Sequence, residues 1–421
     1  MFSVWKWRLV AFSRKLWVRA SLYALLGVVT ALVAAGVQGF LPSGAGKSFG
    51  AGSVDAILTI LASSMLAVTT FSLGIMVSAL SGAAQAATPR AVVLLMQDGT
   101  TQNVLATFLG TFLFSLVGII ALKAGLYGAG GRLVLFIVTL VMVAVIVLTM
   151  LRWIAHLSEF GRMRDVLSRV ERAAEAALAA RLAAPYLGGH PRRGPLPDGA
   201  HPVFPDRIGY VQHLDTGALE SVAEGAGVQV HVAALPGAFV DPSRPLAHVV
   251  GPAETGVKDR IAAAFTIGQA RSFEQDPRFG LQVLAEVASR ALSPAVNDPG
   301  TAIDVLGRAV RLIALWGAPG EALLKHPHIW VPEIAARELF EDVFRPIARD
   351  GASLVEVQIR LQKALATLAR LDRADFGHAA ARQSDDALAR AEAALAVEAD
   401  REILRDLNVA VRTAAGVPDE A

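Results

Sequence analysis

The sequence predicts a mainly α-helical membrane protein, with four transmembrane helices followed by an α+β domain that has a helical C-terminal part. Between Ala20 and Ser158 only seven side chains carry a formal charge, and they leave four long uncharged runs. Each run is long enough to span a bilayer core of about 30 Å, which needs roughly 20 apolar residues. Residues 207–250 then change to short β-compatible runs, and residues 258–411 return to a helical period.

The four spans are expected over residues 18–41, 56–87, 103–126 and 132–156. The second uncharged run would form about 51 Å of helix at 1.5 Å per residue. It is longer than a bilayer requires, so this helix must tilt, kink or project beyond the membrane. A short helix should follow it, with Thr88 as the N-cap, Pro89 at the first helical position and Gly99 at the end.

The basic residues predict the orientation of the spans. Residues 1–19 place three tryptophans among five basic side chains, a pattern typical of an amphipathic helix at the membrane interface. Five Lys and Arg lie in the N-terminal segment up to Arg19 and five lie between Arg152 and Arg172, whereas the loop 41–54 has one and the loop 123–132 has two. The positive-inside rule therefore predicts that both termini lie in the cytoplasm.

Charge also divides the chain into two unlike parts. Residues 1–158 hold ten basic and two acidic groups, a net charge of +8, and residues 159–421 hold 29 basic and 35 acidic groups, a net charge of −6. Because the basic part is the apolar part, its charges favour contact with the lipid bilayer rather than with nucleic acid. We expect no nucleic-acid partner.

These observations predict four regions along the chain. Residues 1–157 form the transmembrane domain with its amphipathic N-terminal helix, and residues 158–206 form a helix continuous with the last span and a Pro-rich linker. A small α+β subdomain covers 207–257, and a helical cytosolic subdomain covers 258–421. The subdomain should contain strands at 209–214, 228–233 and 246–250 and a helix at 216–224. No clear internal repeat is found.

The second span carries a stripe of small and hydroxylated residues along one helical face. Its members are Ser63, Ala67, Thr70, Gly74, Ser78, Ser81 and Gln85. Such a stripe can line a water-accessible path, where hydroxyl and carbonyl oxygens replace the hydration shell of an ion. It can equally let helices pack closely, because small residues allow backbones to approach one another. The sequence leaves both interpretations open.

The densest group of polar residues in the C-terminal half lies between 271 and 302. Its members are Arg271, Gln275, Asp276, Ser293, Asn297, Asp298 and Thr301. Asp276 and Asp298 each precede a proline, which predicts two capped helices, about 277–291 and 299–316, joined by a short turn. Helix N-termini can also hold anions, so a cytosolic ligand site is the alternative to simple capping.

Catalytic signatures are missing from the chain. There is no cysteine, which excludes disulfides, thiolate catalysis and Cys-ligated metals. No zinc-protease, nucleophile-elbow or dinucleotide-binding motif occurs, and Gly44–Ser48 lacks the first glycine of a phosphate-binding loop. We therefore predict no catalytic residue, no metal, no cofactor and no enzymatic activity.

Several segments resemble domain-of-unknown-function family 2254, a family of bacterial predicted membrane proteins. They are Ser64–Leu80, Thr88-Pro89-Arg90, Asp98, Gln102–Phe112, Gln275–Gly280 and Ala291–Ala302. The resemblance covers nearly the whole chain. It implies a multi-pass protein of the bacterial inner membrane, with four membrane helices and a cytosolic C-terminal domain. It supplies neither an activity nor catalytic residues.

The sequence is compatible with two functions. The first is a homo-oligomeric channel or transport protein for a small ion with a cytosolic regulatory domain. Four spans per chain are few to enclose a path, so the copies would assemble around the second helix. The alternative is a membrane-anchored sensor or scaffold without conduction, whose cytosolic domain binds a ligand or protein partner through residues 271–302.

Overall fold

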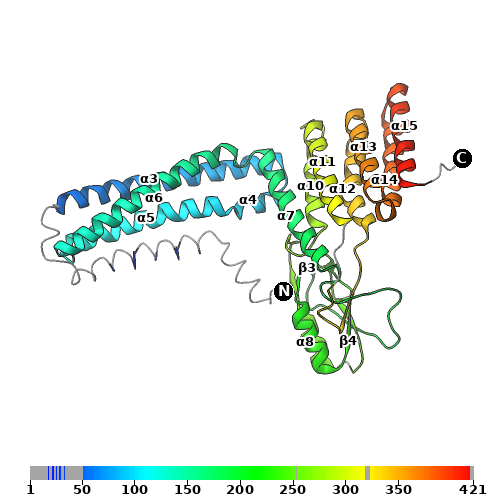
Figure 1. The fold of residues 1–421 in the computed structure, drawn as a ribbon, viewed down its shortest axis with the longest axis horizontal. Coiled ribbons are helices and arrows are strands. Elements are labelled where there is room, and N and C mark those ends of the chain that lie inside the picture. The colour runs from blue at the N-terminus through cyan, green and yellow to red at the C-terminus, as the bar shows by residue number, and fades with distance from the viewer. Residues whose placement is uncertain are drawn as a thin grey trace. The chain divides into compact units, whose positions relative to one another are not determined.

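The computed structural model describes residues 51–252, 254–317 and 323–417, with a few isolated helical positions between Val18 and Val33. Apart from those positions, the first predicted span and the predicted amphipathic N-terminal helix lie outside the described residues. The chain divides into two compact units (Figure 1). Of the described residues from 51 onward, 51–85 and 92–166 belong to the membrane unit, and 86–91 and those from 167 to 417 belong to the C-terminal unit.

Long apolar helices build the membrane unit. Its helices are α3 (Ala51–Ala86), α5 (Gly99–Lys123) and α6 (Ala129–Glu159), and the short α4 (Pro89–Met96) crosses the boundary between the units. Among the described residues α3, α5 and α6 are the three helices long and apolar enough to cross a membrane. They correspond to the second, third and fourth predicted spans. At 36 residues, α3 is as long as the uncharged run predicted.

The helix α5 lies in the middle of this unit. Over the apolar stretch of each helix, 56% of α5 is buried, compared with 17% for α3 and α6. Two core clusters join all three helices, one around Leu58, Phe114 and Leu135 and the other around Met65 and Phe108. Only one face of α3 therefore packs against α5 and α6.

The predicted continuity between the last span and the following helix is wrong. The helix α6 ends at Glu159, and α7 (Met163–Ala183) begins after a turn. Gly161 has φ +76° in that turn, a conformation that ends a helix and that only glycine adopts at little cost. The Asp165 side chain then accepts a hydrogen bond from the Gly161 N–H at 3.2 Å.

Two small sheets form the β part of the C-terminal unit. The five-stranded sheet has the order β1-β8-β4-β6-β2, and the three-stranded sheet has the order β5-β3-β7. The strands are β1 (His190–Pro191), β2 (His201–Val203), β3 (Gly209–Leu214), β4 (Gln229–Val232), β5 (Phe239–Val240), β6 (Ala247–Val250), β7 (Phe265–Gly268) and β8 (Ile329–Val331). Pairings of β8 with β1 and β4 are parallel, and the others are antiparallel.

The strands expected at 209–214, 228–233 and 246–250 are confirmed as β3, β4 and β6, and the expected helix as α8 (Thr216–Ala226). The sheet nevertheless draws strands from outside the predicted subdomain. The Pro-rich linker supplies β1 and β2, which lie at the two edges of the five-stranded sheet. Proline is tolerated there because an edge strand has one unpaired side.

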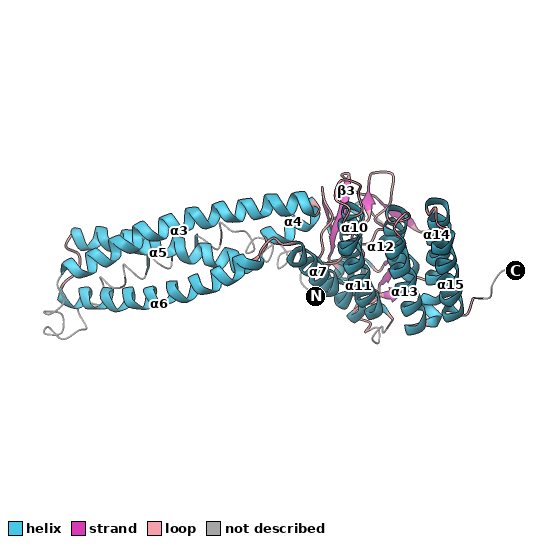
Figure 2. Ribbon diagram, turned by 90° about the horizontal axis from the view of Figure 1, so that it is seen from above, coloured by secondary structure: helices cyan, strands magenta, loops and turns pink. Residues whose placement is uncertain are grey.

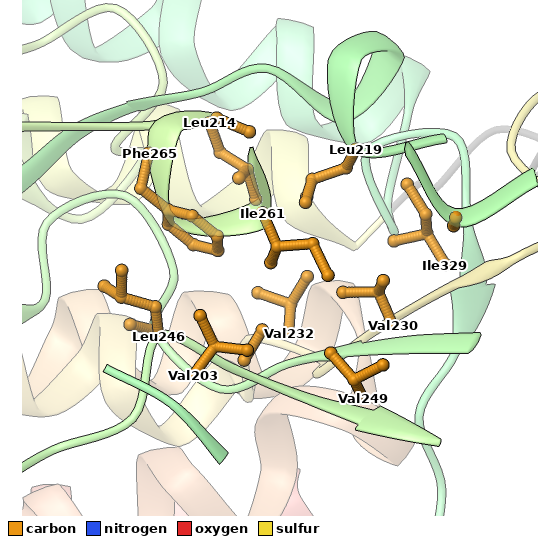
Figure 3. Close-up of a cluster of buried hydrophobic side chains, with 14 of the residues drawn as sticks. Val203, Leu214, Leu219, Val230, Val232, Leu246, Val249, Ile261, Phe265 and Ile329 are labelled. Carbon is orange, nitrogen blue, oxygen red and sulfur yellow. The ribbon is translucent and has the colours of Figure 1, made fainter. Parts of the chain in front are cut away.

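The hydrophobic core of this β part lies between the sheets and the helices α8 and α9 (Thr255–Ala263). Val230, Val232 and Val249 from the sheet are fully buried, as are Leu219 from α8 and Ile261 from α9. Figure 3 shows these side chains pointing toward one another from separate elements. The alternation of apolar residues along β4 and β6 orients that face of the sheet toward the core.

The rest of the C-terminal unit is a two-layered array of helical hairpins (Figure 2). Its helices are α10 (Phe279–Ala291), α11 (Pro299–Trp316), α12 (Ala336–Asp350), α13 (Val355–Leu371), α14 (Arg373–Ala394) and α15 (Glu398–Ala415). One layer packs α10, α12 and α14 in succession, and the other packs α11, α13 and α15. The predicted hairpin of α10 and α11 is confirmed, although α10 begins at Phe279 rather than at 277.

Candidate functional site

The stripe on α3 faces away from α5 and α6. All seven of its residues are exposed, whereas Leu58, Leu61 and Met65 on the opposite face are buried. A Cβ atom added at Gly74 would meet no atom within 4 Å. Among the described helices, none therefore packs on the stripe, so it does not serve the packing of α3 against α5 and α6.

The stripe hydroxyls are bonded within their own helix. Ser63 Oγ donates to the Thr59 carbonyl at 3.0 Å, and Thr70 Oγ1 donates to the Leu66 carbonyl at 3.0 Å. A hydroxyl has one donor and two acceptor lone pairs. Because the donor is used along the helix, these two side chains present only acceptor oxygens outward. That chemistry suits a cation better than an anion.

A second polar group in the membrane unit joins the ends of α5 and α6. Asp98, the N-cap of α5, accepts from the Thr101 N–H and Oγ1 at 2.7 Å each and lies 3.0 Å from His156 Nε2 on α6. One turn earlier, Trp153 Nε1 donates to Ser72 Oγ on α3 at 3.0 Å. The Asp98–His156 pair was not predicted from the sequence; the signal for it was two polar residues at the same end of consecutive antiparallel spans.

In the C-terminal unit, Asp276 is the centre of a buried ionic cluster. Its carboxylate is 2% exposed and accepts from Arg271 Nη2 and Nε at 2.6 and 2.7 Å. The backbone N–H groups of Arg278 and Phe279 also donate to it at 3.2 Å each. Burial raises the pKa of Asp276 above its ordinary value, against the opposing effect of Arg271.

The cluster continues from Arg271 as a ladder to α12. Arg271 Nη1 donates to the Gln282 side chain, and Gln282 Nε2 donates to Asp342 at 2.7 Å. Arg278 Nε donates to the same Asp342 carboxylate at 2.6 Å, and its Nη1 donates to Glu338. This ladder joins the segment before α10 to α10 and α12. It therefore holds these elements together and also pairs their charged side chains.

Arg181 on α7 is a member of this cluster that the sequence analysis missed. Its side chain is 3% exposed, and neither of its terminal nitrogens has a hydrogen-bond partner among the described residues. Burial lowers the pKa of Arg181 to about 10, and the charge of Asp276 opposes that shift. The turn at Gly237 closes the other side, because a Cβ atom there would overlap the Asp276 carboxylate.

The polar residues predicted between 293 and 301 form a local structure that is separate from the Asp276 cluster. Asp298 is the N-cap of α11 and accepts from the Thr301 N–H at 3.0 Å, while Ser293 Oγ donates to the Arg290 carbonyl at 2.7 Å. Asn297 is exposed, with φ +49°. Because the 13 residues of α10 separate the two halves, Asp276 and Asp298 are about 20 Å apart along the hairpin.

The polar residues before α10 have structural partners. Gln275 Oε1 accepts from the Leu214 N–H at 2.8 Å, and thereby extends the hydrogen bonding at the end of β3. No group of three or more His, Asp or Glu that could hold a metal ion occurs within the part of the chain that the structure describes.

Comparison with known proteins places the chain in a family. The family described as Predicted membrane protein (DUF2254) matches residues 13–367. The chain belongs to this family. The family resemblance expected from the sequence is thereby confirmed, and with it the assignment as a membrane protein.

Curated relatives of this family member are uncharacterized. One from Mycobacterium tuberculosis (strain H37Rv) and one from Mycobacterium bovis are each 31% identical over 116 residues, and one from Mycobacterium tuberculosis (strain CDC 1551) is 34% identical over 120 residues. Each match covers 26% of this chain, and it spans only 22% of the relative's length. No solved structure matches the chain.

Proposed function

We propose that this protein is an oligomeric ion channel or transport protein of the bacterial inner membrane, with α3 lining the path. The observation that carries the proposal is the exposed stripe on α3, which runs from Ser63 to Gln85 opposite the packing face. Small side chains there allow α3 helices of neighbouring copies to approach closely. Oxygen acceptors at Ser63 and Thr70 favour a small cation as the conducted ion.

The C-terminal unit is the regulatory part in this proposal. The positive-inside distribution of Lys and Arg supports a location of both termini, and hence of this unit, in the cytoplasm. Its ionic cluster links three helices and a β-turn, so a ligand there can change how they pack. The proposed function includes no enzymatic step.

Ion flux from liposomes tests the proposal directly. The purified protein should release small cations, and Thr70→Leu or Ser78→Leu should reduce the flux at least tenfold by replacing a small polar group with a bulky apolar one. Leu73→Phe is the matched control, because Leu73 is exposed but directly precedes Gly74 and so lies about 100° around the helix from the middle of the stripe. Absence of flux across a panel of monovalent and divalent ions would contradict conduction.

The absence of cysteine makes the chain a ready background for single-cysteine variants. Thr70→Cys and Ser78→Cys should react with a membrane-impermeant thiol reagent and form disulfides between copies. The control Leu73→Cys is exposed about 100° around the helix from Gly74 and should do neither. Unreactive cysteines at all three positions would indicate lipid contact and leave the anchored sensor or scaffold as the better function.

A further inference from the structure

We infer that Arg181 and Arg271 form a binding site for a small oxyanion, a phosphate or carboxylate group, beside Asp276. The first observation is the state of Arg181. Its guanidinium is buried on α7 with two terminal nitrogens lacking a hydrogen-bond partner among the described residues. A buried charged donor without a hydrogen-bond partner destabilises the fold, because its lost hydration is not replaced. A bound anion that accepts these hydrogen bonds would recover much of that free energy.

Another buried arginine of the same unit has its partners within the chain. Arg308 on α11 is also buried, at 6% exposure, and it contacts Glu171 on α7, Asp304 and the Ser168 hydroxyl. The helix α7 therefore supplies the Glu171 carboxylate to Arg308, whereas no described carboxylate accepts a hydrogen bond from the terminal nitrogens of Arg181 on the same helix. Arg308 is the internal reference for a buried arginine whose partners belong to the chain.

The charges along the ladder identify the ligand's sign. At one end Arg278 contacts two carboxylates, those of Asp342 and Glu338. At the other end Arg181 and Arg271 share the field of one carboxylate, that of Asp276. This end holds two arginines and one carboxylate, a local charge of +1, although the three arginines and three carboxylates of the whole cluster balance. Two guanidinium groups also repel any metal cation. A planar guanidinium binds the oxygens of phosphate or carboxylate in pairs, which fits an oxyanion.

Through this site the C-terminal unit could respond to an anion. An anion bound between α7 and the segment before α10 would stabilise one packing of these elements. Only this regulatory role rests on the proposed function, because binding itself is measured without flux. If the protein binds phosphate but shows no cation flux, only the proposed conduction is rejected. If it shows cation flux but does not bind phosphate, only this anion site is rejected.

Thermal unfolding and calorimetry of the full-length protein with inorganic phosphate, against chloride at equal ionic strength, test the inference. Phosphate should stabilise the protein saturably, and Arg181→Met should weaken its affinity at least tenfold. Arg308→Met should lower the starting stability but keep the affinity, because the chain itself pairs Arg308. Sulfate and acetate in place of phosphate distinguish the two oxyanion classes.

Asp276→Asn gives a prediction of opposite sign. Its carboxylate repels a bound anion, so its neutralisation should tighten phosphate binding about tenfold while lowering the starting stability. A purely structural Asp276 would leave the affinity unchanged or weaker, and that result would overturn the inference even if Arg181→Met failed to fold. Absence of saturable stabilisation by all three anions, or equal phosphate affinity in Arg181→Met, would also overturn it and leave water as the partner of Arg181.

Discussion

The stripe on α3 and the cluster around Asp276 use polar side chains in opposite ways. On α3 the hydroxyls of Ser63 and Thr70 are exposed and donate to carbonyls four residues earlier in the same helix. In the C-terminal unit the polar groups around Asp276 are buried or half-buried and bond across α10, α12 and the segment before them. Local bonds leave a polar surface available to another molecule, whereas long-range bonds hold the fold together. Substitutions in the two regions should therefore separate function from stability.

The largest expected effect compares the two aspartates that precede prolines. Asp276→Ala should lower the free energy of unfolding by about 3–5 kcal/mol, because it leaves the buried Arg181 and the half-buried Arg271 without this counter-charge. Asp298→Ala should lower it by about 1 kcal/mol, the usual value of an exposed N-cap. Urea unfolding followed by circular dichroism measures both. Similar losses would mean that burial does not distinguish the two halves of this segment.

Sequence reasoning succeeded where the determining interactions are local. The extents of α3, α5 and α6 follow from uncharged runs, and the hairpin of α10 and α11 follows from two Asp-Pro pairs. A proline can mark a helix start, yet α10 begins at Phe279, two residues after Pro277. Residues 277–278 form a turn instead, and Asp276 accepts from the backbone N–H groups of Arg278 and Phe279 there.

Contacts between distant parts of the chain could not be predicted from the sequence. Arg181 and Asp276 lie on different elements, as do Asp98 and His156, and nothing in their local patterns links them. The strand β8 was missed within a region of helical period because three residues carry too little periodicity. The array of hairpins from α10 to α15 depends on alternating contacts between layers, which leave no repeated motif in the residues.

A smaller effect concerns histidines on the outer face of the five-stranded sheet. His231 on β4 is opposite His248 on β6 and stacks on Trp330 with ring centroids 5.0 Å apart. Burial lowers the pKa of both histidines below the ordinary value of 6.5, and the charge of Arg192 lowers them further. The folded state thus holds these rings neutral, and the unfolded chain binds more protons below pH 6.5. Stability is present above that pH and is lost as the pH falls toward the lowered values.

Thermal unfolding between pH 7.5 and 5.5 measures this dependence. The midpoint of the C-terminal unit should fall with pH, and His231→Phe should reduce the slope while keeping a ring against Trp330. His201→Phe on β2 is the control, because His201 is exposed and should leave the slope unchanged. An unchanged slope in His231→Phe would mean that the charged form of this ring is as well accommodated in the fold as in the unfolded chain.

The smallest expected change in stability lies on the stripe. Thr70→Val keeps the branched shape and removes a hydroxyl whose donor bonds only to its own helix, so the free energy of unfolding should change by less than about 0.5 kcal/mol. Ser72→Ala, two residues away, removes the buried acceptor of Trp153 Nε1 and should cost about 1–3 kcal/mol. If Thr70→Val still lowers cation flux while Ser72→Ala lowers stability, the exposed hydroxyls act on the ion and not on the fold. A stability loss in Thr70→Val equal to that in Ser72→Ala would instead place the stripe in a helix interface and remove the argument for a path along it.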